Sequence, residues 1–148
     1  MIGSKVMCQI GLVVHDIEET GQKYADFLGV EKPQAVHSGP VDVAKAVYKG
    51  QPSDATCKMM FFELDNLQLE LIQPDETPSI WRDVLDEKGE GVHHVAFQVK
   101  GAKDLMSNLE DKGYGTSMYG NYGDGSGMYA YLDTEKDLKM IVELLESF

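Results

Sequence analysis

The stretch Glu90–Val99, EGVHHVAFQV, places a pair of histidines at the front of an apolar run that is typical of a β-strand. An earlier stretch, MCQIGLVV at Met7–Val14, has the same pattern of a polar residue before an apolar run. At a constant offset Gln9 aligns with His94, and the apolar residues that follow align as well. The chain therefore contains an internal repeat in which the polar residue of one strand changes from glutamine to histidine.

Each copy of this strand is followed by a predicted helix. In the first copy Asp16 is the expected cap, Gly29 ends the helix, and one face carries Ile17, Tyr24 and Leu28. In the second copy Gly113 ends a helix whose apolar face carries Ala102, Leu105 and Leu109. Both halves thus begin with a strand, a helix and a glycine.

Further strands follow in both halves. The first half has a hairpin that turns at Asp65–Asn66, and a strand at 43–48 is expected to complete it. The second half has a longer turn at 134–137. Between the halves, residues 77–89 are predicted to form a linker helix with Thr77 as its cap and Pro78 at its first position. The expected organisation is one α+β domain, 1–148, of two βαβββ modules, 1–74 and 91–148.

The alternation of side chains along a strand assigns the polar residues to faces of the sheet. Gln9 lies opposite the face of Ile10 and Leu12, and the repeat places His94 in the same way. His93 is then expected to face away from His94 and to support the structure rather than the site. The same alternation puts two further carboxylates, Glu70 and Glu143, on the face of Gln9 and His94.

These four polar residues point to a metal site. A buried carboxylate without a partner is costly, two close together are worse, and the lysines fall mostly in helices and loops. A divalent ion would be balanced by two carboxylates and completed by an imidazole and an amide oxygen. The predicted metal ligands are Gln9, Glu70, His94 and Glu143. Zinc, cobalt, nickel and manganese all accept such a nitrogen and oxygen set.

Composition excludes several classes of protein. The formal net charge of −12, with Arg82 as the only arginine, argues against nucleic acid and anionic membranes as partners. No run approaches the roughly 18 apolar residues of a membrane span, and no signal-peptide pattern begins the chain. Cys8 and Cys57 are too few for a disulfide framework, so a reducing cytoplasm is the expected location.

The run LELIQPDETPSIWRDVLDEKGEGVHHVAFQV, residues 69–99, resembles the methylmalonyl-CoA epimerase branch of the vicinal oxygen chelate superfamily. That superfamily also contains glyoxalase I, extradiol dioxygenases and antibiotic-resistance proteins, and the resemblance covers nearly the whole chain. It implies a cupped mixed sheet, the glyoxalase-like fold, around a divalent metal held by the four positions named above. It also implies a homodimer, with the ligands supplied by one chain or by two.

Two features point to different relatives within that superfamily. The epimerase branch usually has histidine where this chain has Gln9, and in the loop 49–56 only Asp54 stands where that branch often has a glutamate. A Gln, Glu, His, Glu set instead resembles the ligands of one type of glyoxalase I. The resemblance therefore leaves the two branches open.

The chemistry that both branches share is removal of an α-proton beside a carbonyl that a metal polarises. Glu143 and Glu70 are the candidate bases. The first expectation is an epimerase acting on an acyl-CoA thioester such as methylmalonyl-CoA. One alternative is a glyoxalase I-type lactoylglutathione lyase acting on a glutathione hemithioacetal, and another is a non-catalytic binding or resistance protein. An iron dioxygenase is disfavoured because Gln9 replaces a histidine of the triad that such enzymes need.

Some residues keep two interpretations. Arg82 is a candidate anchor for a substrate anion or part of a solvated helix face, and Gln98 shares the face of His94 and is a candidate substrate contact. Lys45 or Lys49 would be available to the phosphates of a CoA thioester. The glycine- and tyrosine-rich segment Gly113–Gly127 suits either a mobile lid or a plain flexible connection.

Overall fold

The computed structural model describes the whole chain, from Met1 to Phe148. Its strands form one ten-stranded sheet in the order β2-β5-β6-β1-β7-β10-β9-β8-β3-β4. The strands before residue 75 are β1 (Met7–Val13), β2 (Val36–His37), β3 (Val47–Tyr48), β4 (Gln51–Pro52), β5 (Cys57–Glu63) and β6 (Gln68–Pro74). The strands after residue 90 are β7 (Gly91–Gln98), β8 (Thr116–Asn121), β9 (Gly127–Leu132) and β10 (Ile141–Ser147).

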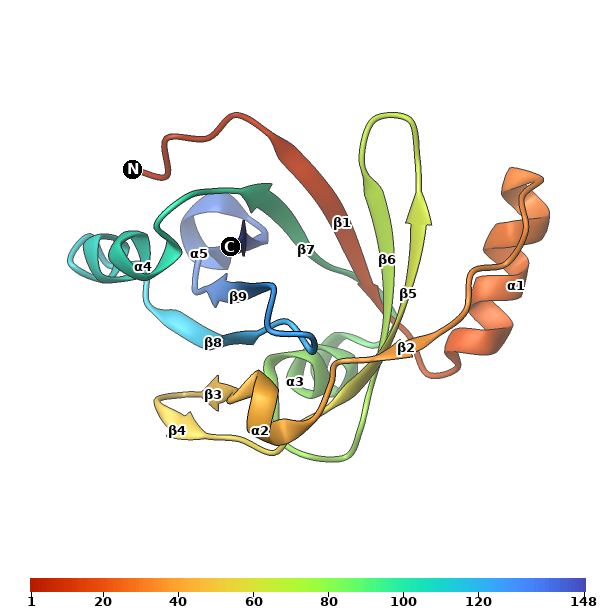
Figure 1. The fold of residues 1–148 in the computed structure, drawn as a ribbon, viewed down its shortest axis with the longest axis horizontal. Coiled ribbons are helices and arrows are strands. Elements are labelled where there is room, and N and C mark those ends of the chain that lie inside the picture. Colours follow the sequence, from red (N-terminus) through yellow and green to blue (C-terminus); the bar gives the residue numbers. More distant parts are fainter.

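The two halves of the chain repeat one strand arrangement. In each half the first strand runs parallel to the last one, β1 with β6 and β7 with β10. The halves join through β1 and β7, which pair antiparallel in the middle of the sheet. The sheet curls so strongly that β8 and β9 lie well away from the plane of β5 and β6 (Figure 1). This architecture confirms the predicted α+β fold of paired βαβββ modules in a cupped mixed sheet.

Five helices accompany the sheet: α1 (Ile17–Leu28), α2 (Val41–Ala44), α3 (Ile80–Lys88), α4 (Ala102–Glu110) and α5 (Glu135–Leu138). Figure 1 shows α1 and α4 at opposite ends of the molecule, and α3 between the halves. None of them is long and apolar enough to cross a membrane.

Helix α1 has the predicted ends, and its packed face includes the predicted Ile17 and Tyr24 but not Leu28. The Asp16 side chain accepts a hydrogen bond from the Glu19 amide at 2.9 Å, and Gly29 ends the helix at a φ of 70°. The helix approaches the sheet at its middle, where a Cβ on Gly21 would lie 2.4 Å from the Met60 sulfur. Leu28, predicted to be buried, is exposed because it lies in the last turn, beyond this close approach.

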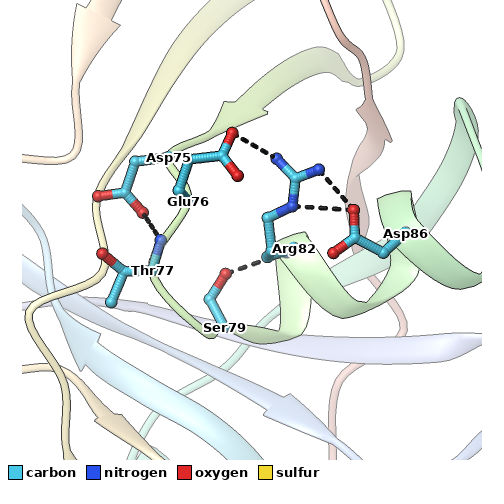
Figure 2. A network of polar contacts seen from close by, with 6 residues as sticks. All are labelled: Asp75, Glu76, Thr77, Ser79, Arg82 and Asp86. Atoms are coloured by element: carbon cyan, nitrogen blue, oxygen red, sulfur yellow. Dashed lines mark hydrogen bonds and ion pairs between the residues drawn. The ribbon is translucent and has the colours of Figure 1, made fainter.

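Helix α3 begins later than the sequence predicted. Its cap is Ser79, whose hydroxyl accepts from the Arg82 amide at 3.0 Å. Thr77 is not the cap, because Ser79 is extended, with φ −157° and ψ 166°, and the helix starts only after it. The Thr77 amide donates to the Asp75 carboxylate at 3.0 Å in the loop before the helix (Figure 2). The predicted span 77–89 is therefore corrected to Ile80–Lys88, with Gly89 directly after it.

Arg82 is engaged on the surface of this linker. Figure 2 shows its guanidinium between two carboxylates, and the side chain donates to Glu76 at 3.3 Å and to Asp86 at 3.0 Å. The Glu76 contact joins α3 to the loop before it, and the Asp86 contact lies within the helix, one turn further on. This placement favours the helix-surface interpretation of Arg82 over that of a substrate anchor.

Residues 36–48 also differ from the prediction of a single strand at 43–48. The strand that covers the outer edge of β5 is β2, and residues 41–44 form the short helix α2 after Pro40. The hairpin of β3 and β4 instead extends the sheet beyond β8, in the other half of the chain. Because β3 pairs with β8 from the other half of the chain, the local sequence around β3 does not indicate this pairing.

The segment Gly113–Gly127 is largely regular. It contains β8, which pairs along its length with β9, and a turn at 122–126. This turn packs against the loop after β2, where a Cβ on Gly39 would lie 2.3 Å from the Cα of Gly123. The segment is therefore mostly a regular hairpin rather than an irregular connection, and Tyr122, Gly123 and Asp124 at its turn line the large cavity.

Candidate active site

The predicted site residues lie in two neighbouring rows that cross the middle of the sheet. In one row Gln9 pairs with Ala96, and Ala96 pairs with Glu143. In the other row Glu70 pairs with Gly11, and Gly11 pairs with His94. The central residue of each row is small. Each row thus has a hollow at its centre toward which longer side chains can turn.

The internal repeat explains why the two rows match. The offset that relates Gln9 to His94 also relates Gly11 to Ala96, and Glu70 and Glu143 both lie on the last strand of their half. The second row is therefore a copy of the first with glutamine replaced by histidine. The four polar side chains come from β1, β6, β7 and β10, which are adjacent in the sheet.

The structure brings all four predicted residues together. The Nε2 atom of His94 lies 3.0 Å from Glu143 Oε2, 3.5 Å from Glu70 Oε2 and 2.9 Å from Gln9 Oε1. None of the four side chains belongs to a residue more than 5% exposed. A histidine, an amide and two carboxylates therefore share one buried cluster.

His93 does not face away from His94 as predicted. Across the β1–β7 pair Gly11 is opposite His94 but Leu12 is opposite Val92, so His93 is an extra residue on β7. Such a bulge breaks the alternation of side chains, and both rings point into the interior. His93 is only 2% exposed, and its Nδ1 lies 3.0 Å from His94 Nδ1.

The contacts of His93 determine how His94 is presented. The carbonyl oxygen of Ile80 can only accept, so His93 carries a proton on Nε2, 3.3 Å from that oxygen. Burial, and then the charge of His94, lowers the pKa of His93 to about 3, so its ring is neutral. Its free Nδ1 accepts from the N–H at His94 Nδ1. The Nε2 atom of His94 is thereby turned toward Gln9, Glu70 and Glu143.

The charges of the cluster are strongly perturbed. Burial, and to a lesser extent Glu143, raises the pKa of Glu70 to about 8 against the opposing effect of His94. Burial disfavours the charged form of His94, but the carboxylates of Glu143 and Glu70 together outweigh it, so the pKa of His94 is raised. Near neutral pH the cluster of the metal-free protein therefore holds protons that a bound cation would displace.

A cavity of about 980 Å³ opens onto this cluster. Gln9, Glu70 and Glu143 line it together with an aromatic wall of Trp81, Tyr129 and Tyr131. The Trp81 indole donates to the Tyr131 hydroxyl at 2.9 Å, which fixes two rings of that wall. The cavity is large enough for a small-molecule substrate.

The mouth of the cavity is acidic. Its lining includes Glu63, Asp65 and Asp124 but no lysine or arginine, so neither Lys45 nor Lys49 reaches it. The Lys49 ammonium pairs with Asp83 at 3.2 Å. Gln98 does line the cavity, as its face predicted.

Residues 8–131 match the sequence profile of the Glyoxalase/Bleomycin resistance protein/Dioxygenase superfamily. The chain belongs to this superfamily. A relative with a curated sequence is the uncharacterized protein YqjC of Bacillus subtilis (strain 168). It is 25% identical over 138 residues, which span 93% of this chain and 89% of that protein.

Solved structures of methylmalonyl-CoA epimerases share the superfamily fold with this chain. The epimerase from Mycobacterium tuberculosis is 18% identical, with 98% of this chain and 89% of that one covered and a TM-score of 0.66. A variant of the Streptomyces coelicolor epimerase in complex with 2-nitronate-propionyl-CoA is 20% identical, with 98% and 99% covered and a TM-score of 0.66. At these identities the likeness shows the fold alone.

The donor set of the cluster suits the divalent cation that this resemblance implied. No three His, Cys, Asp or Glu side chains already surround a metal position. The distances of the carboxylates from His94 are instead those of ion pairs. Yet four electron-pair donors converge here, and two ligands at right angles about a small divalent ion lie about 3 Å apart. The cluster thus has the chemistry and the approximate spacing of a metal site.

Two contributors to the site were missed at the sequence level. His93 was assigned to the wrong face because the bulge is invisible in the sequence. Gln68 accepts a hydrogen bond from the Gln9 side-chain nitrogen at 2.6 Å. It lies two positions before Glu70, on the same face of β6, so the alternation that selected Glu70 would also have selected Gln68.

Proposed function

We propose that the protein is a divalent-metal-dependent isomerase or epimerase that removes an α-proton next to a carbonyl group. The observation that carries this proposal is the convergence of two carboxylates, an imidazole nitrogen and an amide oxygen at the edge of a large cavity. Similarity of fold to methylmalonyl-CoA epimerases supports it.

The proposed metal ligands are Gln9, Glu70, His94 and Glu143. A bound divalent ion would supply Lewis-acid stabilisation of the negative charge that develops when an α-proton leaves. His93 turns the Nε2 of His94 toward the cluster, and the contact with Gln68 turns the Gln9 oxygen in the same direction. Both neutral ligands would thus be oriented before the ion arrives.

The two carboxylates are the proposed acid–base groups. Glu70 is on β6 and Glu143 on β10, which flank the central pair of β1 and β7 from opposite sides. One carboxylate can therefore accept a proton on one face of the substrate while the other, or water, returns a proton on the opposite face. Such an exchange yields the epimer. Return of the proton to the adjacent carbon yields a glyoxalase-type isomer.

The first proposed substrate is an acyl-CoA thioester such as methylmalonyl-CoA, and the second is a glutathione hemithioacetal. Since no lysine or arginine lines the cavity, the acyl and thioester groups would bind inside it and the CoA phosphates outside. Assembly as a homodimer and location in the cytoplasm are further proposals. The free thiols of Cys8 and Cys57 suit a reducing compartment.

The test is proton NMR in deuterated water with protein loaded in turn with cobalt, zinc, nickel and manganese. We expect metal-dependent exchange of the α-proton of methylmalonyl-CoA. Turnover of the methylglyoxal–glutathione adduct alone would move the protein to the glyoxalase branch. No turnover of either compound by metal-loaded protein would reject both substrates, and absence of metal binding would favour a binding protein.

The Glu143→Gln variant tests the assigned base. We expect α-proton exchange to fall at least about a hundredfold, as for loss of a general base. The matched control is Glu110→Gln, which neutralises an exposed carboxylate on α4. Full exchange activity in Glu143→Gln would remove Glu143 from the mechanism.

A further inference from the structure

A chain of three polar side chains runs from the mouth of the cavity to the cluster. Glu63, Gln68 and Gln9 are consecutive partners across β5, β6 and β1. The Gln68 nitrogen donates to Glu63 Oε1 at 2.5 Å, and the Gln9 nitrogen donates to Gln68 Oε1 at 2.6 Å. The pairing of strands thus places an exposed carboxylate at one end and a predicted metal ligand at the other.

The chemistry of the three groups gives this chain a direction. A carboxylate only accepts, so Gln68 must present its nitrogen to Glu63 and its oxygen to Gln9. Gln9 must then present its nitrogen to Gln68, which leaves its oxygen facing the cluster. A reversed Gln9 would require a reversed Gln68, whose oxygen would then face the Glu63 carboxylate.

Without this chain Gln9 would turn the other way. The end of its amide that faces the cluster lies 3.1 Å from Glu143 Oε2 and 3.3 Å from Glu70 Oε2. An unrestrained amide would place its nitrogen there, because that nitrogen can donate to both carboxylates. A nitrogen in this position has no electron pair for a cation, so the direction of the chain decides whether Gln9 can act as a ligand.

We propose that Gln68, oriented by Glu63, is a positioning residue that keeps the Gln9 oxygen aimed at the cation. This inference rests on the metal site of the proposed function. It explains why a glutamine, which binds cations weakly, can occupy the position where the repeat has His94. His94 is oriented by His93, and Gln9 is oriented by Gln68.

The experiment is titration of the metal-free full-length protein with Co²⁺, followed by calorimetry and by the visible absorption of the bound ion. We expect Gln68→Leu to weaken Co²⁺ binding about 10- to 100-fold, the effect typical of losing a group that orients a ligand. Gln51→Leu, at an exposed strand position outside the cavity, is the matched control and should bind as the native protein does.

A reciprocal exchange separates orientation from packing. Glu63→Gln removes the group that sets the direction, so it should weaken binding even though an amide of equal size remains. The double variant Glu63→Gln with Gln68→Glu restores an acceptor for the Gln9 nitrogen and keeps the net charge. We expect it to regain affinity and the native cobalt spectrum.

The outcomes distinguish this inference from the proposed function. If the native protein does not bind Co²⁺, the metal site itself is wrong. If the native protein binds and Gln68→Leu and Glu63→Gln bind equally well with unchanged spectra, the positioning role is wrong. A lower melting temperature with unchanged affinity would also overturn it, because that result would mean a purely structural contact.

Discussion

Gly11 is the position where the smallest change should disrupt the site. A Cβ at this position would lie 2.1 Å from Cε1, 2.5 Å from Nδ1 and 2.6 Å from Nε2 of His94. Its φ lies outside the left-handed region, so alanine is compatible with the backbone, and the conflict is with the ring alone. The substitution Gly11→Ala therefore tests whether the hollow in this row holds His94.

The size of the effect follows from these contacts. Non-bonded carbon atoms settle at about 3.5–4.0 Å, so the ring must move by more than about 1 Å. That movement breaks the 3.0 Å contact with His93, which leaves buried polar groups unpaired. Overpacking costs about 1–3 kcal/mol and a buried unpaired group costs a similar amount, so we expect a loss of about 2–5 kcal/mol in unfolding free energy. For a chain of this size the melting temperature should fall by about 5–15 °C.

The assay compares Gly11→Ala with Gly115→Ala by thermal unfolding and by Co²⁺ titration. Gly115 also has an ordinary φ, and an added Cβ there would meet only the end of the Asp133 side chain, at 3.3 Å. We expect normal stability in Gly115→Ala and, in Gly11→Ala, loss of both stability and Co²⁺ affinity. Equal melting temperatures and affinities for the two variants would refute the claim that Gly11 makes room for His94.

Three further predictions concern protonation, tautomer and substrate. Because the pKa of Glu70 is raised to about 8, its stabilising contribution is present below its unfolded pKa and is lost as the pH rises toward 8. Calorimetry should show the metal-free native protein losing stability relative to Glu70→Gln as the pH rises from about 4.5 to about 8, whereas the loss due to His94, whose pKa is also raised, should be common to both proteins. His93→Leu should weaken Co²⁺ binding about 10- to 100-fold, whereas His93→Gln, which can still donate to Ile80 and accept from His94, should retain more of the affinity. If methylmalonyl-CoA is a substrate, its kcat/KM should rise with added salt, because the net charge of −12 and the acidic cavity mouth repel the CoA phosphates; a fall with salt would reveal a cationic CoA contact.

The sequence predicted the four clustered residues because two independent periodicities agree on them. The strand alternation assigned Gln9, Glu70 and Glu143 to one face, and the internal repeat added His94. Both arguments use only the alternation of side chains along a strand and the repeat in the sequence, and neither needs to know which strands pair. The contacts now seen at 2.9 to 3.5 Å around His94 Nε2 follow from pairing strands that already carried these residues on one face.

The predictions that were wrong concern elements whose position depends on their contacts with neighbouring segments. Thr77 and Ser79 are both good helix caps, and the extended backbone of Ser79 makes the second of them the cap. Strands β2 and β3 are each two residues long, too short to show a period, and β3 pairs with a strand some 70 residues away. Such choices depend on contacts that no local pattern records.

The bulge at His93 shows why the core of the site was only half predictable. A single extra residue on β7 turns two adjacent rings to the same side, and the doubled histidine then supplies both a candidate ligand and the group that orients it. The residues that make room for this arrangement, Gly11 and Ala96, have no chemistry that a motif search would notice. Their importance follows from the register, which places each of them between two long polar side chains. A site of this kind is built as much by the small residues at the centre of its rows as by the ligands around them, so substitutions that enlarge Gly11 should be as damaging to metal binding as the loss of a ligand.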